Sequence, residues 1–230
     1  MQAITLLPGL ACDAELWREQ VSALSALRPV RVSDVHSRFA TLPEMAAALL
    51  AEQRGELLLC GTSMGGMLAL EVVRQAPQRV KALALLASSA RPDTPQLIQL
   101  RSDAIVLFEQ GRLREVLQAN VAFAFDPAHA KALAPAYLAM IERAGATQLI
   151  AQNRAVMARA DQRPLLPQIT CPTLLVCGES DLLTPPEHSQ EMAALIAGAR
   201  LELLPTCGHL LTWEQPQRIN ALLIDWLAGL

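Results

Sequence analysis

The ten residues 57–66, LLLCGTSMGG, join a short apolar run to a serine between glycines. The run 56–60 has the length and leucine content of a buried strand, whereas the three- and four-residue spacing of apolar residues over 64–75 predicts a helix. Ser63 therefore stands on a tight turn between a strand and a helix, in the pattern Gly-x-Ser-x-Gly. Glycines on both sides avoid Cβ collisions in such a strained turn. The pattern makes Ser63 a candidate nucleophile.

Apolar runs and helical patterns alternate on both sides of this stretch. Five more predicted strands lie at 3–7, 30–35, 81–86, 173–177 and 200–204, and further helices at 17–27, 43–52, 187–196 and 216–227. Alternation of this kind is typical of a parallel sheet covered by helices. We therefore predict an α/β fold with a compact, mostly parallel sheet of about six strands, flanked by helices.

One long segment interrupts the alternation. Between the fourth and fifth predicted strands, residues 88–172 contain no convincing strand. Prolines divide this segment into several short predicted helices, at Pro92, Pro95, Pro127, Pro135 and Pro164. We expect one domain over 1–230, with a helical lid at about 90–168 inserted over the carboxyl edge of the sheet, where α/β folds bind ligands. A purely structural subdomain is the alternative.

Composition and charge exclude several classes of protein. Hydrophobic residues make up 52% of the 230 residues and charged residues 18%, which is typical of a globular chain. The net charge is −3 and no basic stripe is present, so we expect neither nucleic acid nor an anionic membrane as a partner. The longest apolar run, 82–87, is far too short to span a membrane.

The amino terminus and the cysteines favour a cytoplasmic protein. MQAITLLPG lacks the basic and long apolar regions of a secretory signal, although a chain whose signal had been removed would look the same. The five cysteines are scattered and form no Cys-x-x-Cys pair, so we predict reduced thiols and no metal site. We expect a monomer or a homodimer.

A serine nucleophile needs a base and an orienting acid. His209 follows the last predicted strand, in Thr-Cys-Gly-His, at the same sheet edge as Ser63. At the end of the fifth strand, Cys-Gly-Glu-Ser-Asp offers Asp181, which we prefer to Glu179 because an aspartate three residues after a glycine turn aims its carboxylate at an imidazole. The order serine, aspartate, histidine is the one expected for a triad on such a sheet. The alternatives are a surface role for His209 and a turn or capping role for Asp181.

An ester-cleaving serine also needs two N–H groups for the developing oxyanion. Met64 opens the helix after Ser63, so its backbone N–H faces the space above the serine. The second donor is predicted at the amide of Leu10, in Leu-Pro-Gly-Leu-Ala-Cys after the first strand, where Gly9 permits the turn. A phosphate-binding loop is the rival interpretation of GTSMGG, but the Gly-Lys-[Ser/Thr] ending of such loops is missing.

Four segments together resemble the α/β-hydrolase superfamily, and the resemblance extends over essentially the whole chain. They are GTSMGG, GESD, CGHLLTWEQP and the opening LLPGLACDAELW, whose final tryptophan packs below the oxyanion loop in that family. The resemblance implies a triad of Ser63, Asp181 and His209, with the amides of Leu10 and Met64 as the oxyanion hole. Pro8 stands where many relatives have a histidine, and two antiparallel strands that precede this point in many relatives are missing here.

The combined prediction is a serine hydrolase, most specifically a carboxylesterase that cleaves small to medium carboxylic esters through an acyl-enzyme on Ser63. No metal and no organic cofactor are expected. Candidate pocket residues in the insertion are Phe123, Phe125, Met140 and Met157, each of which is equally compatible with core packing.

Two alternatives to this function stay open. The same triad also serves carbon–carbon bond hydrolases, lyases and cofactor-free peroxidases or perhydrolases. A module that binds a small ligand without turnover is a further alternative, although it has no physical need of all three triad residues. Cys12 and Cys207 lie in loops at the predicted active edge, so their oxidation or alkylation is expected to hinder activity.

Overall fold

A computed structural model describes residues 2–230 of the chain. Its six strands form one sheet in the order β2-β1-β3-β4-β5-β6, and each neighbouring pair is parallel. The strands are β1 (Ile4–Leu7), β2 (Val30–Val32), β3 (Leu57–Thr62), β4 (Val80–Leu86), β5 (Thr173–Gly178) and β6 (Arg200–Leu204). The predicted α/β fold is confirmed.

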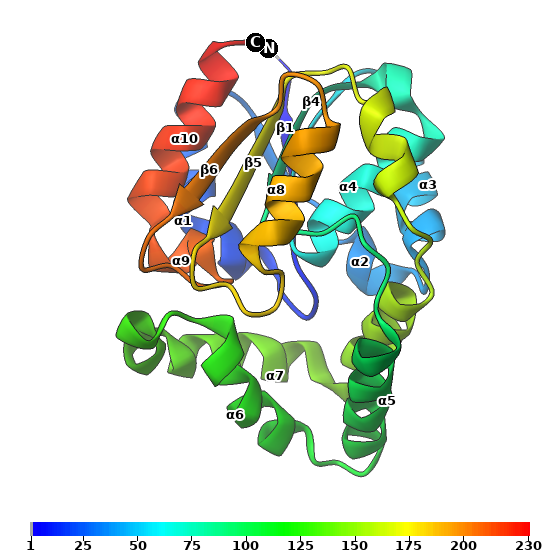
Figure 1. Cartoon of the computed structure of the whole chain (residues 1–230), viewed down its shortest axis with the longest axis vertical. Coiled ribbons are helices and arrows are strands. Elements are labelled where there is room, and N and C mark those ends of the chain that lie inside the picture. The colour runs from blue at the N-terminus through cyan, green and yellow to red at the C-terminus, as the bar shows by residue number, and fades with distance from the viewer. Residues whose placement is uncertain (1) are drawn as a thin grey trace.

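Successive residues of each strand point to opposite faces of the sheet and fill two separate cores. On β3, Leu58 and Cys60 pack into one core, whereas Leu57 and Leu59 pack into the other. The first core is covered by α1 (Arg18–Leu24) and α10 (Pro216–Ala228), the second by α3 (Leu42–Glu52), α4 (Met64–Gln75) and α8 (Pro186–Leu195). Figure 1 shows these helices on either side of the sheet. Because both faces are buried, the strands appear in the sequence as continuous apolar runs.

The chain changes direction across the sheet between β1 and β3. From β1 it passes to β2 on one side, and it then returns to place β3 on the other side of β1. The loops that leave β1 and β3 therefore lie side by side at the carboxyl edge, at the change of direction, which is where ligands bind in open parallel sheets. A Cβ built on Gly9, in the loop after β1, would lie 3.4 Å from the Cβ of Ser63, so these two loops meet.

The second strand is shorter than predicted. The apolar pattern suggested a strand over 30–35, but β2 ends at Val32, and Val35 begins the short helix α2 (Val35–Arg38). Val35 is buried in the core beneath α3 and α4 rather than in the sheet. The hydrophobic character of Val35 correctly predicted that it is buried. It did not predict the element, because a strand and a short helix bury such a residue equally well.

Three helices fill the segment between β4 and β5, which we call the insertion: α5 (Pro95–Glu109), α6 (Leu113–Ala124) and α7 (Pro127–Met157). Pro95 and Pro127 open their helices, where the fixed φ of proline fits the first turn. The predicted break at Pro135 is wrong, because α7 continues through it and bends at Gly145 instead, with φ 76° and ψ 169°. Glycine tolerates this positive φ, which most residues avoid.

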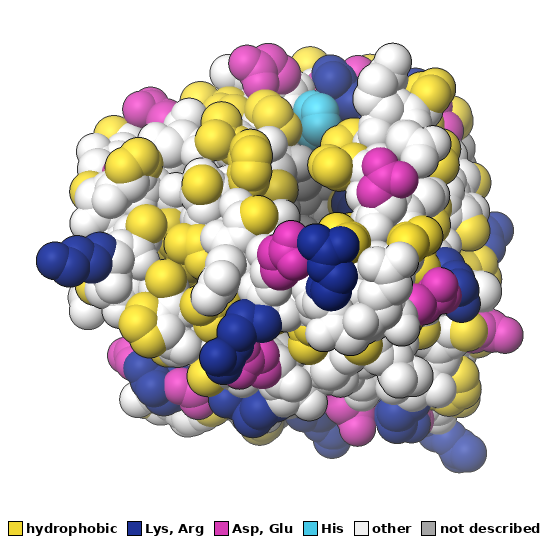
Figure 2. All heavy atoms as spheres, turned by 90° about the horizontal axis from the view of Figure 1, so that it is seen from below, with side chains coloured by type: hydrophobic (Ala, Val, Ile, Leu, Met, Phe, Trp, Pro, Cys, Tyr) yellow, Lys and Arg dark blue, Asp and Glu magenta, His cyan; other side chains and the backbone are white. Residues whose placement is uncertain are grey.

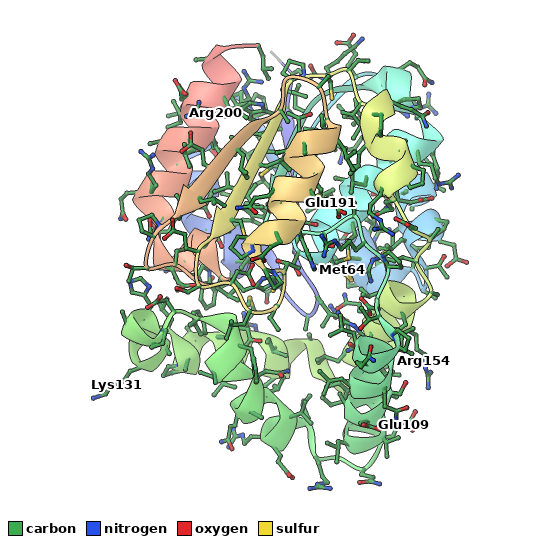
Figure 3. The ribbon with its side chains drawn as sticks, viewed as in Figure 1. Met64, Glu109, Lys131, Arg154, Glu191 and Arg200 are labelled. Carbon is green, nitrogen blue, oxygen red and sulfur yellow. The ribbon has the colours of Figure 1, made fainter. Side chains whose placement is uncertain are left out.

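The insertion lies across the carboxyl edge of the sheet (Figure 1). Arg154 of α7 pairs with Glu109 of α5 at 3.1 Å, on the outer side of the insertion, at the right of the view (Figure 3). The outer face of this part of the molecule shows hydrophobic side chains on one side of a hollow and charged side chains beside it (Figure 2). Its role as a lid stays a prediction.

Four short helical turns complete the described chain: η1 (Ala14–Trp17), η2 (Pro77–Arg79), η3 (Arg163–Gln168) and α9 (Leu211–Glu214). Trp17, at the end of the first of these turns, is completely buried in the core that also contains Ala11 and Cys12 of the loop after β1. Among residues 2–230, no helix combines the length and the apolar character that crossing a membrane would require.

Candidate active site

Ser63 has a strained backbone between β3 and α4. Its φ of 52° and ψ of −119° lie outside the regions that non-glycine residues normally occupy. Two hydrogen bonds hold it there: its N–H donates to the carbonyl of Leu86 at 2.9 Å, and its own carbonyl accepts from the Ser88 hydroxyl at 2.8 Å. Strain of this kind persists only where the surroundings enforce it, and it is commonly found at functional sites.

The two glycines of the Gly-x-Ser-x-Gly pattern are required by close backbone contacts. A Cβ on Gly61 would collide with the backbone of Gly65, and a Cβ on Gly65 would collide with the carbonyl of Leu7 in β1. The turn therefore packs backbone against backbone between β3, α4 and β1. The steric reason that we gave for these glycines from the sequence agrees with this geometry.

Asp181 and His209 form a buried hydrogen-bonded pair. The imidazole Nδ1 lies 2.8 Å from Oδ2 and 3.0 Å from Oδ1 of the carboxylate. Because an ionised carboxylate only accepts, Nδ1 carries the proton, and this tautomer leaves Nε2 free to act as a base. Asp181, 2% exposed, also accepts from the backbone N–H groups of Leu183 and Thr184 and from the Thr184 hydroxyl, each at 2.9 Å.

These donors keep Asp181 ionised despite its burial. Burial by itself raises the pKa of a carboxyl group, because it penalises the charged form. The charge and hydrogen bond of His209, together with the donors of Thr184, outweigh that effect and hold the pKa of Asp181 below its ordinary value. Asp181 is therefore a fixed negative charge beside the imidazole at neutral pH.

The histidine loop is attached to the insertion. The backbone N–H groups of His209 and Leu210 both donate to the carbonyl of Ala124, the last residue of α6, at 3.1 Å. The side chain of Glu214, which is completely buried, bridges the same two segments: its Oε2 accepts from the backbone N–H of Gly208 at 3.0 Å and of Asp126 at 2.9 Å. Sequence reasoning missed Glu214, although it lies within the quoted segment CGHLLTWEQP.

The two predicted oxyanion donors lie in loops that meet at Ser63. Met64 is the first residue of α4, a position whose N–H has no acceptor within its own helix. Leu10 lies in a tight turn in which the N–H of Cys12 donates to the carbonyl of Gly9 at 3.2 Å. Figure 3 shows Met64 at the edge of the sheet that faces the insertion. The assignment of both N–H groups to an oxyanion hole stays a prediction.

The four candidate pocket residues do not share one environment. Phe125 and Met140 are buried in the same core, where the Phe125 ring meets Tyr137 edge-on at 5.3 Å. Phe123 is 48% exposed on α6. Met157, half-buried at the end of α7, has its sulfur 3.9 Å from the hydroxyl of Ser102. Their participation in a substrate pocket stays a prediction.

The two cysteines at this edge are poor nucleophiles. Burial, reinforced by the charge of Asp13, raises the pKa of Cys12 to about 12. Burial likewise raises the pKa of Cys207, which is completely inaccessible. The reactive thiolate is therefore scarce at neutral pH. Within residues 2–230, His, Cys, Asp and Glu side chains form no group of three or more suited to a metal ion.

The chain is similar in sequence to a known family and to several curated proteins. A family model of the alpha/beta hydrolase fold matches residues 33–216. The pimeloyl-[acyl-carrier protein] methyl ester esterase of Nitrosomonas europaea is 27% identical over 223 residues, which cover 90% of this chain and 88% of the relative. A putative carbamate hydrolase of Serratia proteamaculans is 25% identical over 244 residues, which cover 97% and 90% of the two chains.

Solved structures agree on the fold. A thermophilic esterase from Thermogutta terrifontis, determined with malate bound, superposes with a TM-score of 0.90. The superposition covers 100% of this chain and 90% of that one, at 24% sequence identity. A similarity of this kind concerns the arrangement of the elements rather than the substrate.

Proposed function

The chain belongs to the alpha/beta hydrolase fold family, and from that premise we propose that it is a serine hydrolase, specifically a carboxylesterase for small to medium carboxylic esters. The observation that carries the proposal is the buried hydrogen-bonded pair of Asp181 and His209, at the same sheet edge as the strained Ser63. A receptor that only binds a ligand gains nothing from a carboxylate, an imidazole and a strained serine at one edge.

In this mechanism His209 Nε2 removes the proton of the Ser63 hydroxyl, and the oxygen attacks the ester carbonyl. Asp181 stabilises the imidazolium that forms. The backbone N–H groups of Leu10 and Met64 hold the oxyanion of the tetrahedral intermediate, a contribution worth about 10²–10³ in kcat for one donor. His209 then protonates the departing alcohol. Water, activated by the same imidazole, releases the acid from the acyl-enzyme.

The relatives support a carbonyl substrate with a heteroatom leaving group. One is named as a methyl ester esterase and another as a putative carbamate hydrolase. Both linkages are cleaved by attack on a carbonyl carbon, so both suit the mechanism above. We rank esters first, because several of the curated relatives are named as pimeloyl-[acyl-carrier protein] methyl ester esterases.

The test begins with a fluorophosphonate probe, which labels an activated serine. We expect labelling of the protein as isolated, loss of labelling in Ser63→Ala, and unchanged labelling in Ser25→Ala, an exposed serine at the end of α1, before the chain enters β2. A panel of p-nitrophenyl esters, methyl esters and carbamates then ranks the linkages. Labelling or turnover that survives loss of Ser63 would overturn the assignment of the nucleophile.

A further inference from the structure

The loop that carries Leu10 contains a second strained residue, Ala11. The hydrogen bond from the Cys12 N–H to the Gly9 carbonyl closes a four-residue turn, with Leu10 and Ala11 at its centre. Ala11 has a φ of 58°, whereas Leu10 is not among the residues with positive φ. A positive φ at the third position alone defines a type II turn, which normally has glycine there. An alanine in this position favours rotation of the peptide that joins Leu10 to Ala11.

Gln152, on α7 of the insertion, opposes that rotation. Its Oε1 accepts a hydrogen bond from the backbone N–H of Ala11 at 2.6 Å, and its Nε2 donates to the carbonyl of His36 at 2.9 Å. The imidazole Nε2 of His36 in turn donates to the carbonyl of Cys12 at 2.8 Å. Gln152 is 1% exposed. One buried amide therefore holds the turn directly at Ala11 and indirectly through His36.

A partly open cavity beside this loop leaves room for the turn to move once these hydrogen bonds are lost. A cavity of about 290 Å³, lined in part by Pro8 and Cys12, borders the loop. Without Gln152, the Ala11 N–H would be buried without a partner, which is unfavourable. The turn would relieve both that cost and the strain at Ala11 by rotating the Leu10–Ala11 peptide. The Leu10 N–H is part of the preceding Gly9–Leu10 peptide, and we expect that peptide to shift with the rearranged turn and to carry its N–H away from the space above Ser63.

We propose that Gln152 is a positioning residue that holds the Leu10–Ala11 turn, and with it one donor of the oxyanion hole, in the reactive orientation. The inference rests on the proposed function, since it takes the Leu10 N–H as a donor to the oxyanion. It gives the insertion a second part in the reaction: besides covering the edge of the sheet, α7 supports the loop that stabilises the transition state.

The test is Gln152→Met, which keeps the length of the side chain and removes both hydrogen bonds. On p-nitrophenyl acetate we expect kcat to fall about 10- to 100-fold, somewhat less than loss of a whole oxyanion donor. KM should change less than about threefold, because the ground-state ester depends little on the oxyanion hole. The pH profile of kcat/KM should keep its shape, because Asp181 and His209 are unaltered.

The matched control is Asn153→Leu. Asn153 is the adjacent buried amide on α7, and it bonds Leu149 and Arg101 rather than the oxyanion loop. Its loss should leave kcat within about threefold of the unmodified protein. A rescue variant, Gln152→Met with Ala11→Gly, should recover several-fold in kcat, because glycine adopts the positive φ of this turn without strain. A residue that only stabilised the fold would show no such rescue.

Gln152→Glu serves where Gln152→Met does not fold, because it retains the acceptor for Ala11. We expect its kcat to stay closer to that of the unmodified protein than the kcat of Gln152→Ala does. Two results would overturn the inference and leave the proposed function intact, provided that the unmodified protein shows Ser63-dependent turnover. One is a kcat of Gln152→Met equal to that of the unmodified protein. The other is an equal kcat in Gln152→Ala and Gln152→Glu. Absence of Ser63-dependent turnover in the unmodified protein would instead overturn the proposed function.

Discussion

At the scale of single residues, the chemistry depends on how burial and hydrogen bonds set the state of each side chain. Asp181 is buried and ionised, because four hydrogen-bond donors, one each from His209 and Leu183 and two from Thr184, compensate the cost of removing its charge from water. Cys12 is buried without such compensation for a negative charge, so its thiol stays protonated. The surroundings therefore reinforce the ordinary state of each side chain at neutral pH, an ionised carboxylate at Asp181 and a protonated thiol at Cys12.

Replacement of Asp181 by asparagine should abolish most activity while keeping the fold. An amide cannot accept the Nδ1 proton of His209 in the same way, and the imidazole would adopt the wrong tautomer, with kcat lower by about 10⁴. Ester turnover measured at saturating substrate checks this. Asp103→Asn, at an exposed position of α5, is the control. Activity of Asp181→Asn within tenfold of the unmodified protein would remove Asp181 from the mechanism.

The lowered pKa of Asp181 also predicts how stability depends on pH. A carboxyl group whose pKa is lower in the folded state stabilises the fold above its unfolded pKa, about 3.9 for aspartate. That contribution disappears as the pH falls through the lower, folded pKa. The difference in unfolding free energy between the unmodified protein and Asp181→Asn, measured in urea, should therefore shrink between pH 6 and pH 3. A difference that grows on acidification would contradict the assigned direction.

The cysteines at the active edge should resist alkylation, contrary to what their positions in the sequence suggested. Cys12 and Cys207 are buried, and the raised pKa of each keeps its thiolate scarce at pH 7.5. We expect iodoacetamide to leave ester turnover unchanged over an hour, and mass spectrometry to find both residues unmodified. Denatured protein, in which all five cysteines react, is the control. Rapid inactivation with modification at Cys12 would show that its loop opens.

At the scale of elements, the insertion is attached to the sheet edge at both ends of the proposed site. The junction of α6 and α7 bonds the histidine loop through Ala124 and Glu214, and the second half of α7 bonds the loop after β1 through Gln152. The bend at Gly145 separates these two contacts and lets one long helix reach both. A lid that opened as a rigid flap would break them all, so any opening movement is expected elsewhere, in α5 or in the part of α6 that precedes Ala124.

Loss of Glu214 should weaken this attachment. Glu214→Ala leaves the buried N–H groups of Gly208 and Asp126 without an acceptor, which costs about 1–3 kcal/mol for each unsatisfied group. We expect a lower midpoint of urea unfolding and a lower kcat, because the loop of His209 loses a support. Glu56→Ala, at an exposed ion pair with Lys81, should change stability by less than about 1 kcal/mol. Equal stability of the two variants would refute the role of Glu214.

At the scale of the whole molecule, the reversal of strand order between β1 and β3 creates the proposed site. It brings the loop of Leu10 against the turn of Ser63, while β5 and β6, further along the same edge, deliver Asp181 and His209. The insertion then covers that edge. The proposed catalytic residues therefore come from loops of several elements, whereas the buried strands serve as the rigid scaffold that positions those loops.

Much of this architecture could be predicted from the sequence, because apolar runs and glycine positions are local patterns that indicate strands and tight turns. Continuous apolar runs marked all six strands, and the glycines at 61 and 65 marked the turn at Ser63. The pattern failed where two structures satisfy it equally: Val35 is buried in a short helix rather than in β2, and Pro135 is accommodated inside α7. Local sequence does not distinguish such cases, since tertiary packing decides them.

The sequence by itself determined the strands, the strained turn at Ser63 and the chain order of the candidate triad. Hydrophobic periodicity and steric clashes in tight turns depend on residues that are close together in the sequence, so they can be recognised there. Only the tertiary structure decided which polar groups meet. Asp181 and His209 are 28 residues apart and Ala11 and Gln152 are 141 apart, and nothing periodic connects either pair. Such hydrogen bonds exist because packed helices and strands bring distant donors to buried acceptors, which would otherwise lose their hydrogen bonds to water without replacement.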